Sequence, residues 1–344
     1  MKRQLAVWQL IHRSLVQNIP VMLLYVLESN GSSPGRKGFF MAVNNNGEMQ
    51  GSIGGGIMEH KFVEMAKEKL QAGSDKGLGM SIKKQFHDKS SAKNQSGMIC
   101  SGEQTNFLYR MKENDFDKVN SLLETLAQNK NGLLELSPAG FSFSKDIVPK
   151  ENFLFVFESY EQWMYREKTG LKNYLYIIGG GHCSLALSRI MRGMDFYIYL
   201  VDDRRNLKTF EENNFVHQKT TIADYSGLKD IISPGENCYV VIMTVGYRTD
   251  DIALRALLHT DLAYLGVLGS AAKIEKMFSD YRREGIAESD LQKIHAPIGL
   301  SINSQTTEEI AISIAAEIIS TKNQKEKPTD QLSSHSEALY SGKL

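Results

Sequence analysis

Residues 174–203 combine a glycine-rich turn with an acidic residue in the order that nucleotide-binding proteins use. The stretch reads YLYIIGGGHCSLALSRIMRGMDFYIYLVDD, with Gly179 and Gly181 at the first two positions of G-x-G-x-x-G and Ser184 at the third. Such a loop turns a strand into a helix whose N-terminal N–H groups bind a phosphate. The pattern predicts phosphate binding, with the His182 ring at the helix start close to the ligand.

Asp202 ends the second apolar run, where a carboxylate accepts hydrogen bonds from a ribose. An aspartate at this position favours NAD(H) over NADP(H). The alternatives are a sheet whose loop binds no ligand and, for His182, a surface histidine at a helix start. The loop does not by itself predict hydride transfer, because no substrate base paired with an anion-binding arginine can be picked out. Cys183 falls on the apolar helix face, where we expect packing.

A second run of glycines precedes a helix in QGSIGGGIMEHKFVEMA, residues 50–66. Gly54, Gly55 and Gly56 would hold a second anion, and Glu59 lies in the first helical turn, where acidic side chains favour the helix dipole. The alternative is a tight turn with Glu59 as an ordinary helix-start residue. Two such junctions in two domains suggest a ligand between the domains.

Several single residues are weaker candidates. His295 precedes Pro297 in a turn after a strand, a usual place for ligand contacts in a parallel sheet, although a structural histidine fits as well. Arg36 and Lys37 in the turn PGRKG would reach an anion, or would be simply solvated. No group of histidines and cysteines has zinc-site spacing, so no metal site is predicted.

The three cysteines are Cys100, Cys183 and Cys238. Cys100 lies in GMICSG, where a thiol of lowered pKa would face a cleft, but packing of a buried free cysteine is the alternative. Cys238 precedes the apolar run YVVIM and is predicted to be inert.

From Tyr174 onward, short apolar runs alternate with helical periodicity, which predicts a doubly wound parallel sheet over residues 174–322. Thr306 and Glu309 fit a capping box before the last helix. The preceding residues, 1–160, contain apolar runs joined by short turns, including a hairpin signal at NNNG, and predict an α+β domain. The polar stretch 159–173 is expected to be the linker, and 323–344 a flexible tail.

Composition fits a two-domain globular protein of 344 residues, with 42% hydrophobic and 23% charged residues. The 40 basic residues balance the 40 acidic ones, so neither nucleic acid nor an anionic membrane is an expected partner. The N-terminus is an interrupted, amphipathic helix pattern and not a signal peptide, and no run reaches the roughly 18 apolar residues of a membrane span. We therefore expect a cytoplasmic protein with reduced thiols.

The motifs ESNGSSPGRKGFFMAV, GSIGGGIMEH, CSG at 100–102, YIIGGGHCSLAL, VDDR, GVLGSAAK and HAPIGLSINSQTTEEIAISIAAEI occur in this order from about residue 15 to 320. Together they resemble the XdhC/CoxI family, the xanthine dehydrogenase accessory proteins. The resemblance implies an N-terminal α+β XdhC/CoxI domain, a C-terminal Rossmann domain and a homodimer. It also implies binding of molybdenum cofactor, which is molybdopterin or its dinucleotide.

In this family the cofactor is sheltered while a cysteine desulfurase helps to install a sulfido ligand, and it is then delivered to the xanthine dehydrogenase. The resemblance gives Cys100 a role in handling the metal or sulfur, and places Gly269 and Ser270 at an anion site. Three motifs depart from the family: Cys-Gly-Gly reads CSG at 100–102, T-H-D-H reads TVGY at 244–247 with Asp250 retained, and Gly-Ser-Arg-Arg-Lys reads GSAAK at 269–273.

The sequence thus predicts an accessory protein that binds and delivers molybdopterin to a molybdenum hydroxylase and is not itself a catalyst. An NAD(P)-dependent oxidoreductase using the same loop is the alternative, with NAD as its cofactor. A third hypothesis is an interaction scaffold with a vestigial Rossmann fold. The form of the pterin and the client enzyme stay open.

Overall fold

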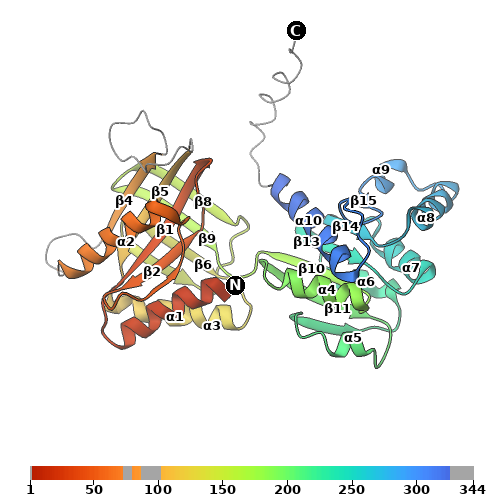
Figure 1. Cartoon of the computed structure of the whole chain (residues 1–344), viewed down its shortest axis with the longest axis horizontal. Coiled ribbons are helices and arrows are strands. Elements are labelled where there is room, and N and C mark those ends of the chain that lie inside the picture. Colours follow the sequence, from red (N-terminus) through yellow and green to blue (C-terminus); the bar gives the residue numbers. More distant parts are fainter. Residues whose placement is uncertain (1, 73–79, 87–101, 326–344) are drawn as a thin grey trace, which may run out of the picture. The chain divides into compact units, whose positions relative to one another are not determined.

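A computed structural model of the chain describes residues 2–72, 80–86 and 102–325. The chain divides into two compact units, residues 1–172 and 173–344 (Figure 1). Each unit has its own hydrophobic cores and is described separately.

The described residues of the N-terminal unit form two antiparallel sheets and three main helices. One sheet has the strand order β3-β2-β1-β5-β4 and the other β7-β6-β9-β8. The elements are α1 (Lys2–Val16), β1 (Val21–Gly31), β2 (Phe40–Asn44), β3 (Met49–Gly51), α2 (Gly56–Gln71), β4 (Met80–Phe86), β5 (Gly102–Arg110), a 3₁₀ turn (Glu113–Asp115), α3 (Phe116–Ala127), β6 (Leu133–Ser137), β7 (Gly140–Ser144), β8 (Phe153–Ser159) and β9 (Gln162–Lys168).

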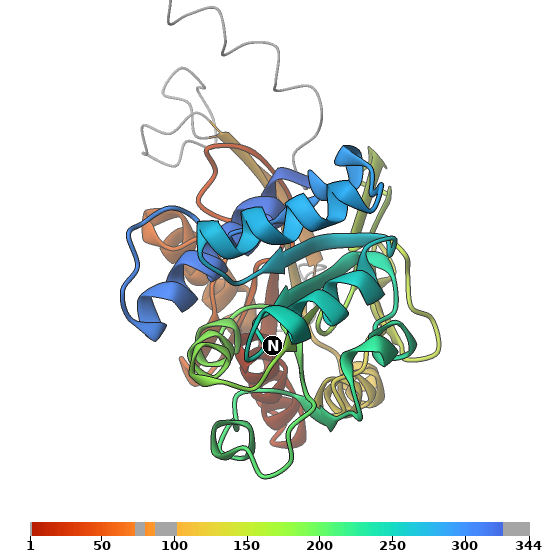
Figure 2. The ribbon, with the colours of Figure 1, turned by 90° about the vertical axis from the view of Figure 1, so that its right-hand side faces the viewer.

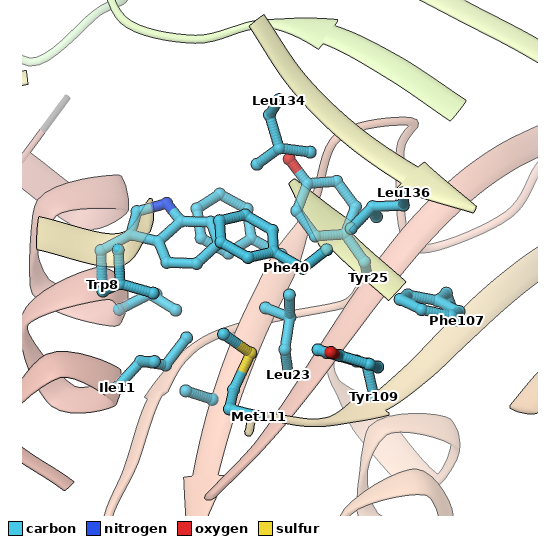
Figure 3. Packing of buried hydrophobic residues seen from close by; sticks show 14 of the residues in the cluster. Trp8, Ile11, Leu23, Tyr25, Phe40, Phe107, Tyr109, Met111, Leu134 and Leu136 are labelled. Carbon is cyan, nitrogen blue, oxygen red and sulfur yellow. The ribbon is translucent and has the colours of Figure 1, made fainter. Parts of the chain in front are cut away.

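Strand β1 is apolar over most of its length because both of its faces are covered. Leu23 and Tyr25 point into a core shared with α1, α3 and the second sheet. Met22 and Leu24 point to the opposite face, where α2 packs. Since successive strand residues face opposite sides, a strand covered on both faces needs no polar positions. Figure 3 shows the first core, in which Trp8 lies beside Phe40 and Phe40 stacks on Tyr25.

The C-terminal unit is a six-stranded parallel sheet in the order β12-β11-β10-β13-β14-β15. Its elements are β10 (Asn173–Ile178), α4 (His182–Met191), β11 (Phe196–Asp202), α5 (Lys208–Glu211), β12 (Gln218–Thr221), a 3₁₀ turn (Tyr225–Gly227), α6 (Leu228–Ile231), β13 (Gly235–Ile242), α7 (Tyr247–Leu257), β14 (Leu262–Val267), α8 (Ala271–Arg283), α9 (Glu288–Leu291), β15 (Ile294–His295) and α10 (Thr307–Lys325).

Helices cover both faces of this sheet (Figure 2). Helices α4 and α10 pack on one face and α6, α7 and α8 on the other. The chain leaves β10 toward β11 and β12, then returns to β13 on the other side of β10. The predicted doubly wound parallel sheet is therefore confirmed, and its topological switch point lies between β10 and β13, where such folds bind ligands.

Two local predictions are confirmed. The NNNG turn joins β2 and β3 in an antiparallel hairpin. The capping box at the start of α10 forms, because the Glu309 N–H donates to Thr306 Oγ1 at 3.2 Å and the Thr306 N–H donates to Glu309 Oε2 at 3.1 Å.

The prediction of a linker over 159–173 is wrong for most of that stretch. Residues 162–168 form β9, which pairs with both β6 and β8. Trp163 and Tyr165 fill the core of the N-terminal unit, so the polar residues between them are the outward half of an alternating strand. At the other end, α10 extends to Lys325, three residues into the predicted tail. Residues 326–344 of that tail lie outside the described residues.

Candidate functional site

The loop between β10 and α4 requires glycine at its first position. Gly179 has a φ of +103°, and a Cβ there would lie 2.4 Å from the carbonyl oxygen of Met243. Ser184 is buried and donates from Oγ to the carbonyl of Gly179. Ser184, at the third position of the motif, therefore forms a hydrogen bond to the backbone of the loop itself.

Gly181, in contrast, faces open space. It is the N-cap of α4, has an ordinary φ of −73°, and makes no side-chain cap. A Cβ on Gly181 would meet no atom within 4 Å. The neighbouring His182 side chain is exposed. The first N–H groups of α4 are therefore left without a capping side chain, as an anion site at a helix N-terminus needs.

A second uncapped helix start lies beside this loop. Gly246 is the N-cap of α7, and it too has no side-chain cap and no atom within 4 Å of its would-be Cβ. The contact of Gly179 with Met243 places the β10–α4 loop against the loop that leads to α7. Two helix N-termini that begin at glycines and lack a side-chain cap thus follow neighbouring loops at the topological switch point, and their partial positive charges favour an anion there.

Asp202 ends β11, as predicted, but its carboxylate is engaged. Oδ2 accepts from the Gly180 N–H at 2.6 Å, and Arg204 covers both carboxylate oxygens. Burial opposes ionisation of Asp202, but the hydrogen bonds from Arg204 and Gly180 outweigh it and lower the pKa of Asp202. Asp202 therefore holds the β10–α4 loop in position as an ionised carboxylate.

A buried network links the ends of β13 and β14. Asp250, which is fully buried, accepts from the Thr244 N–H at 2.9 Å, from Thr244 Oγ1 at 2.6 Å and from Lys273 Nζ. Lys273 also donates to the carbonyl of Leu268 at 3.0 Å. The network fixes the loop that carries Gly246, which gives Asp250 a positioning role.

Gly269 and Ser270 belong to the start of α8. Ser270 is the N-cap of α8, and its Oγ accepts from the Lys273 N–H at 3.3 Å. A Cβ on Gly269 would lie 2.9 Å from the Lys273 side chain. The start of α8 is therefore capped by its own chain, unlike the starts of α4 and α7.

His295 pairs with α10 and a neighbouring tyrosine. Its Nδ1 lies 3.2 Å from Glu317 Oε1, and its ring lies over Tyr264, with 4.3 Å between centroids. Burial opposes ionisation of Glu317, but hydrogen bonds from His295, Tyr264 and the Gly299 N–H lower its pKa. Both His295 and Glu317 therefore have hydrogen-bond partners within the C-terminal unit itself.

The glycine loop of the N-terminal unit is organised by Glu59. Its Oε2 accepts from Ser52 Oγ at 2.6 Å, from the Ile53 N–H at 2.9 Å and from the Gly55 N–H at 3.0 Å. Gly54, Gly55 and Gly56 all have positive φ, and a Cβ on Gly54 would lie 2.4 Å from the backbone nitrogen of Gly35. A loop N–H that an anion would need is thus bonded to a carboxylate of the same chain.

Gln104 joins this loop to the PGRKG turn. Its Oε1 accepts from Ser33 Oγ at 2.8 Å and the Gly35 N–H at 3.2 Å, and its Nε2 donates to the Ile53 carbonyl at 3.0 Å. Arg36 in the same turn is exposed and donates to the Gly31 carbonyl at 3.1 Å, and Lys37 is half-buried. The structure therefore brings the two glycine-containing turns of this unit together.

Neither cysteine within the described part of the chain is poised as a thiolate. Burial raises the pKa of Cys183 and raises that of Cys238 to about 12. Both thiols contact hydrophobic cores, which agrees with the predicted packing roles. Cys100, the candidate for metal or sulfur handling, lies outside the described residues.

Two residues that the sequence analysis did not single out are central to the geometry. Arg204 follows Asp202 by two positions in VDDRR, a spacing that pairs the side chains after a strand end. Gln104 carried no signal, because its partners lie on separate turns and strands. Within residues 2–72, 80–86 and 102–325, no three His, Cys, Asp or Glu side chains group as metal ligands, and no helix is long and apolar enough to cross a bilayer.

Comparison with known proteins matches both units to one family. A model of the XdhC and CoxI family matches residues 14–78, and a model of the XdhC Rossmann domain matches residues 175–318. The Escherichia coli K12 protein named Uncharacterized protein YqeB is 28% identical over 311 residues, which are 89% of this chain and 44% of that protein. A probable xanthine dehydrogenase subunit from Bacillus subtilis strain 168 is 33% identical over 82 residues, which are 24% of this chain and 23% of that protein.

The matched segments thus cover less than half of either curated relative. Among solved structures, one described as a xanthine dehydrogenase from Bacillus halodurans covers 94% of this chain and 97% of its own, with a TM-score of 0.68. At 20% identity, this likeness shows a shared fold.

Proposed function

Because the chain belongs to the XdhC/CoxI family, we propose that it is an accessory protein that binds molybdopterin and delivers it to a xanthine dehydrogenase-type enzyme. The name of the Bacillus subtilis relative supports a client of this class. A cysteine desulfurase would help to install the sulfido ligand, and the accessory protein would act as a homodimer.

The observation that carries the proposal is the pair of glycine-capped helix starts at the switch point. Gly181 and Gly246 leave the N–H groups of α4 and α7 uncapped and leave open space in front of them. A phosphate fits such a place, because it accepts several backbone hydrogen bonds and its charge matches the helix dipoles. Molybdopterin bears a phosphate, so the residues present suit that end of the ligand.

The chain's own residues would hold the ligand and not transform it. Ser184 and Asp202 fix the first loop by hydrogen bonds to its backbone, and Asp250 with Lys273 fixes the second. When bound, the cargo brings its own metal and redox chemistry. Binding of the phosphate end leaves the rest of the pterin available for sulfuration and transfer.

Thermal unfolding of the full-length chain with added molybdopterin, or with added NADH, tests the proposal. A ligand that binds only the folded chain stabilises it by about 2.7 kcal/mol at 100 times its Kd. We expect molybdopterin to raise the Tm and the loaded chain to activate a cofactor-free xanthine dehydrogenase. Stabilisation by NADH alone would favour the oxidoreductase alternative, which the dinucleotide-type strand order supports. Stabilisation by neither ligand would favour the scaffold hypothesis.

A further inference from the structure

The carboxylate at the end of β11 is fully occupied by donors of the chain itself. Asp202 is 0% exposed. Its Oδ1 accepts from the N–H of Arg204 at 2.8 Å and from Arg204 Nε at 2.9 Å. Its Oδ2 accepts from the Gly180 N–H at 2.6 Å and from Arg204 Nη2 at 2.7 Å. A carboxylate offers about four lone-pair sites, so none is left for a ribose hydroxyl.

At the end of β11, the side chain that reaches solvent is a hydrogen-bond donor, Arg204, and not an acceptor. The Arg204 side chain is 36% exposed and lies against Asp202. Its Nε and Nη2 bond to Asp202, whereas no acceptor in the described part of the chain engages Nη1. A guanidinium carries five N–H donors and no acceptor. Where a dinucleotide fold usually offers a carboxylate to a ribose, this chain offers a carboxylate that Arg204 already neutralises, together with the guanidinium N–H groups that Asp202 does not use.

The segment that follows Arg204 is also tied to the glycine loop. Thr209 Oγ1 donates to the Gly180 carbonyl at 2.6 Å, and a Cβ on Gly180 would lie 2.9 Å from the Phe210 ring. The segment that follows Arg204 thus packs on the loop that precedes α4. A phosphate at the start of α4 would lie at the same end of the sheet as the guanidinium.

We infer that Arg204 makes this site selective for a ligand that places a phosphate monoester beside its guanidinium over one that places a ribose hydroxyl there. A monoester carries a charge of about −1.5 to −2 near neutral pH, and a guanidinium binds such a group well. The inference rests on the proposed function and narrows its ligand to molybdopterin itself, in preference to the dinucleotide form. Among adenine dinucleotides it favours NADP(H) over NAD(H), the reverse of the expectation from the acidic residue alone.

The test measures dissociation constants of the full-length chain for molybdopterin, its dinucleotide, NADPH and NADH by calorimetry. The variants are Arg204→Gln, which removes the charge, and Arg204→Lys, which keeps the charge but loses the paired geometry. Arg205→Gln is the matched control, because Arg205 is exposed and adjacent in sequence. Thermal unfolding verifies that each variant is folded.

We expect the wild-type chain to bind molybdopterin at least tenfold more tightly than its dinucleotide, and NADPH at least tenfold more tightly than NADH. Arg204→Gln should weaken monoester binding about 10- to 100-fold, the range for one charge-assisted hydrogen bond, and should expose Asp202 to the ribose of the other ligands. The affinity of Arg204→Lys for these ligands should fall between those of wild type and Arg204→Gln, and the affinity of Arg205→Gln should equal that of wild type.

If molybdopterin and its dinucleotide bind equally well, the inference fails and the proposed function stands. If NADPH is preferred but neither pterin binds, the proposed function fails and the selectivity stands. Equal affinity for NADPH and NADH overturns the inference.

Discussion

Two glycines in one loop should respond in opposite ways to substitution. Gly179→Ala forces a side chain into a φ of +103° and places a Cβ 2.4 Å from the Met243 carbonyl. The backbone strain costs about 1–3 kcal/mol and the overpacking about as much again. We therefore expect a loss of about 4 kcal/mol, which for a unit of this size lowers Tm by on the order of 10 °C.

Gly181→Ala should leave stability nearly unchanged. Its φ of −73° suits any residue, and the added Cβ meets no atom within 4 Å. Alanine is a poorer N-cap than glycine by up to about 1 kcal/mol, and the reduced entropy of the unfolded chain offsets about 0.4–1 kcal/mol. The added methyl would instead obstruct a phosphate at the α4 start. Loss of one charge-assisted hydrogen bond weakens binding about 10- to 100-fold, and Gly181→Val should weaken it further.

Scanning calorimetry and titration with molybdopterin separate the two effects. Gly193→Ala is the matched control, because Gly193 lies beyond the other end of α4 and its added Cβ makes only an ordinary contact at 3.5 Å. We expect Gly179→Ala to lose stability and Gly181→Val to lose affinity while staying folded. Wild-type affinity in folded Gly181→Val would refute the placement of the phosphate at α4.

Three further changes test other parts of the molecule. Burial, with the Arg192 charge, lowers the pKa of His217 to about 4, and its Nδ1 accepts from the Ile198 N–H, so stability should fall as pH decreases from about 6.5 toward 4. Denaturant titrations across this range should show a smaller fall for His217→Gln. Glu59→Gln should leave molybdopterin affinity within about twofold of wild type by calorimetry, and a marked gain would place the phosphate at the N-terminal loop. Cys100→Ser should retain the pterin but fail to restore activity to a desulfo client enzyme, since a hydroxyl is not a soft ligand; normal reactivation would exclude a role for the thiol.

Local patterns sufficed to predict the C-terminal sheet. Continuous apolar runs and helical periodicity depend on nearby residues, and so does the capping box of Thr306 and Glu309. The position of the glycine-rich turn was predictable for the same reason, because glycines between an apolar run and a helix mark a sharp strand-to-helix turn. The sequence could not tell which glycine serves the turn and which faces open space, since that depends on Met243, far along the chain.

Strand β9 was missed because its partners are distant. Trp163, Tyr165 and Glu167 alternate with polar residues, but a buried glutamate argues against a core strand. In the structure, Glu167 Oε2 accepts from Tyr25 and Tyr165 at 2.6 and 2.7 Å, and Lys172 Nζ lies 2.8 Å from Oε1. These donors come together only in the folded chain, and their hydrogen bonds offset the cost of burying the Glu167 charge.

The partners of a buried or half-buried carboxylate also distinguish the two glycine loops, which looked equivalent in sequence. Each has a carboxylate that accepts loop N–H groups, Glu59 in one and Asp202 in the other. Asp202 is covered by Arg204, so an incoming phosphate meets a neutralised pair and free guanidinium donors. Oε2 of Glu59 accepts from three uncharged donors, the Ser52 hydroxyl and the Ile53 and Gly55 N–H groups, so the negative charge of this carboxylate would oppose an anion at the N-terminal loop. Electrostatics therefore favour phosphate binding at the loop of the parallel sheet, and give the N-terminal glycines a structural role in the turns that Gln104 joins.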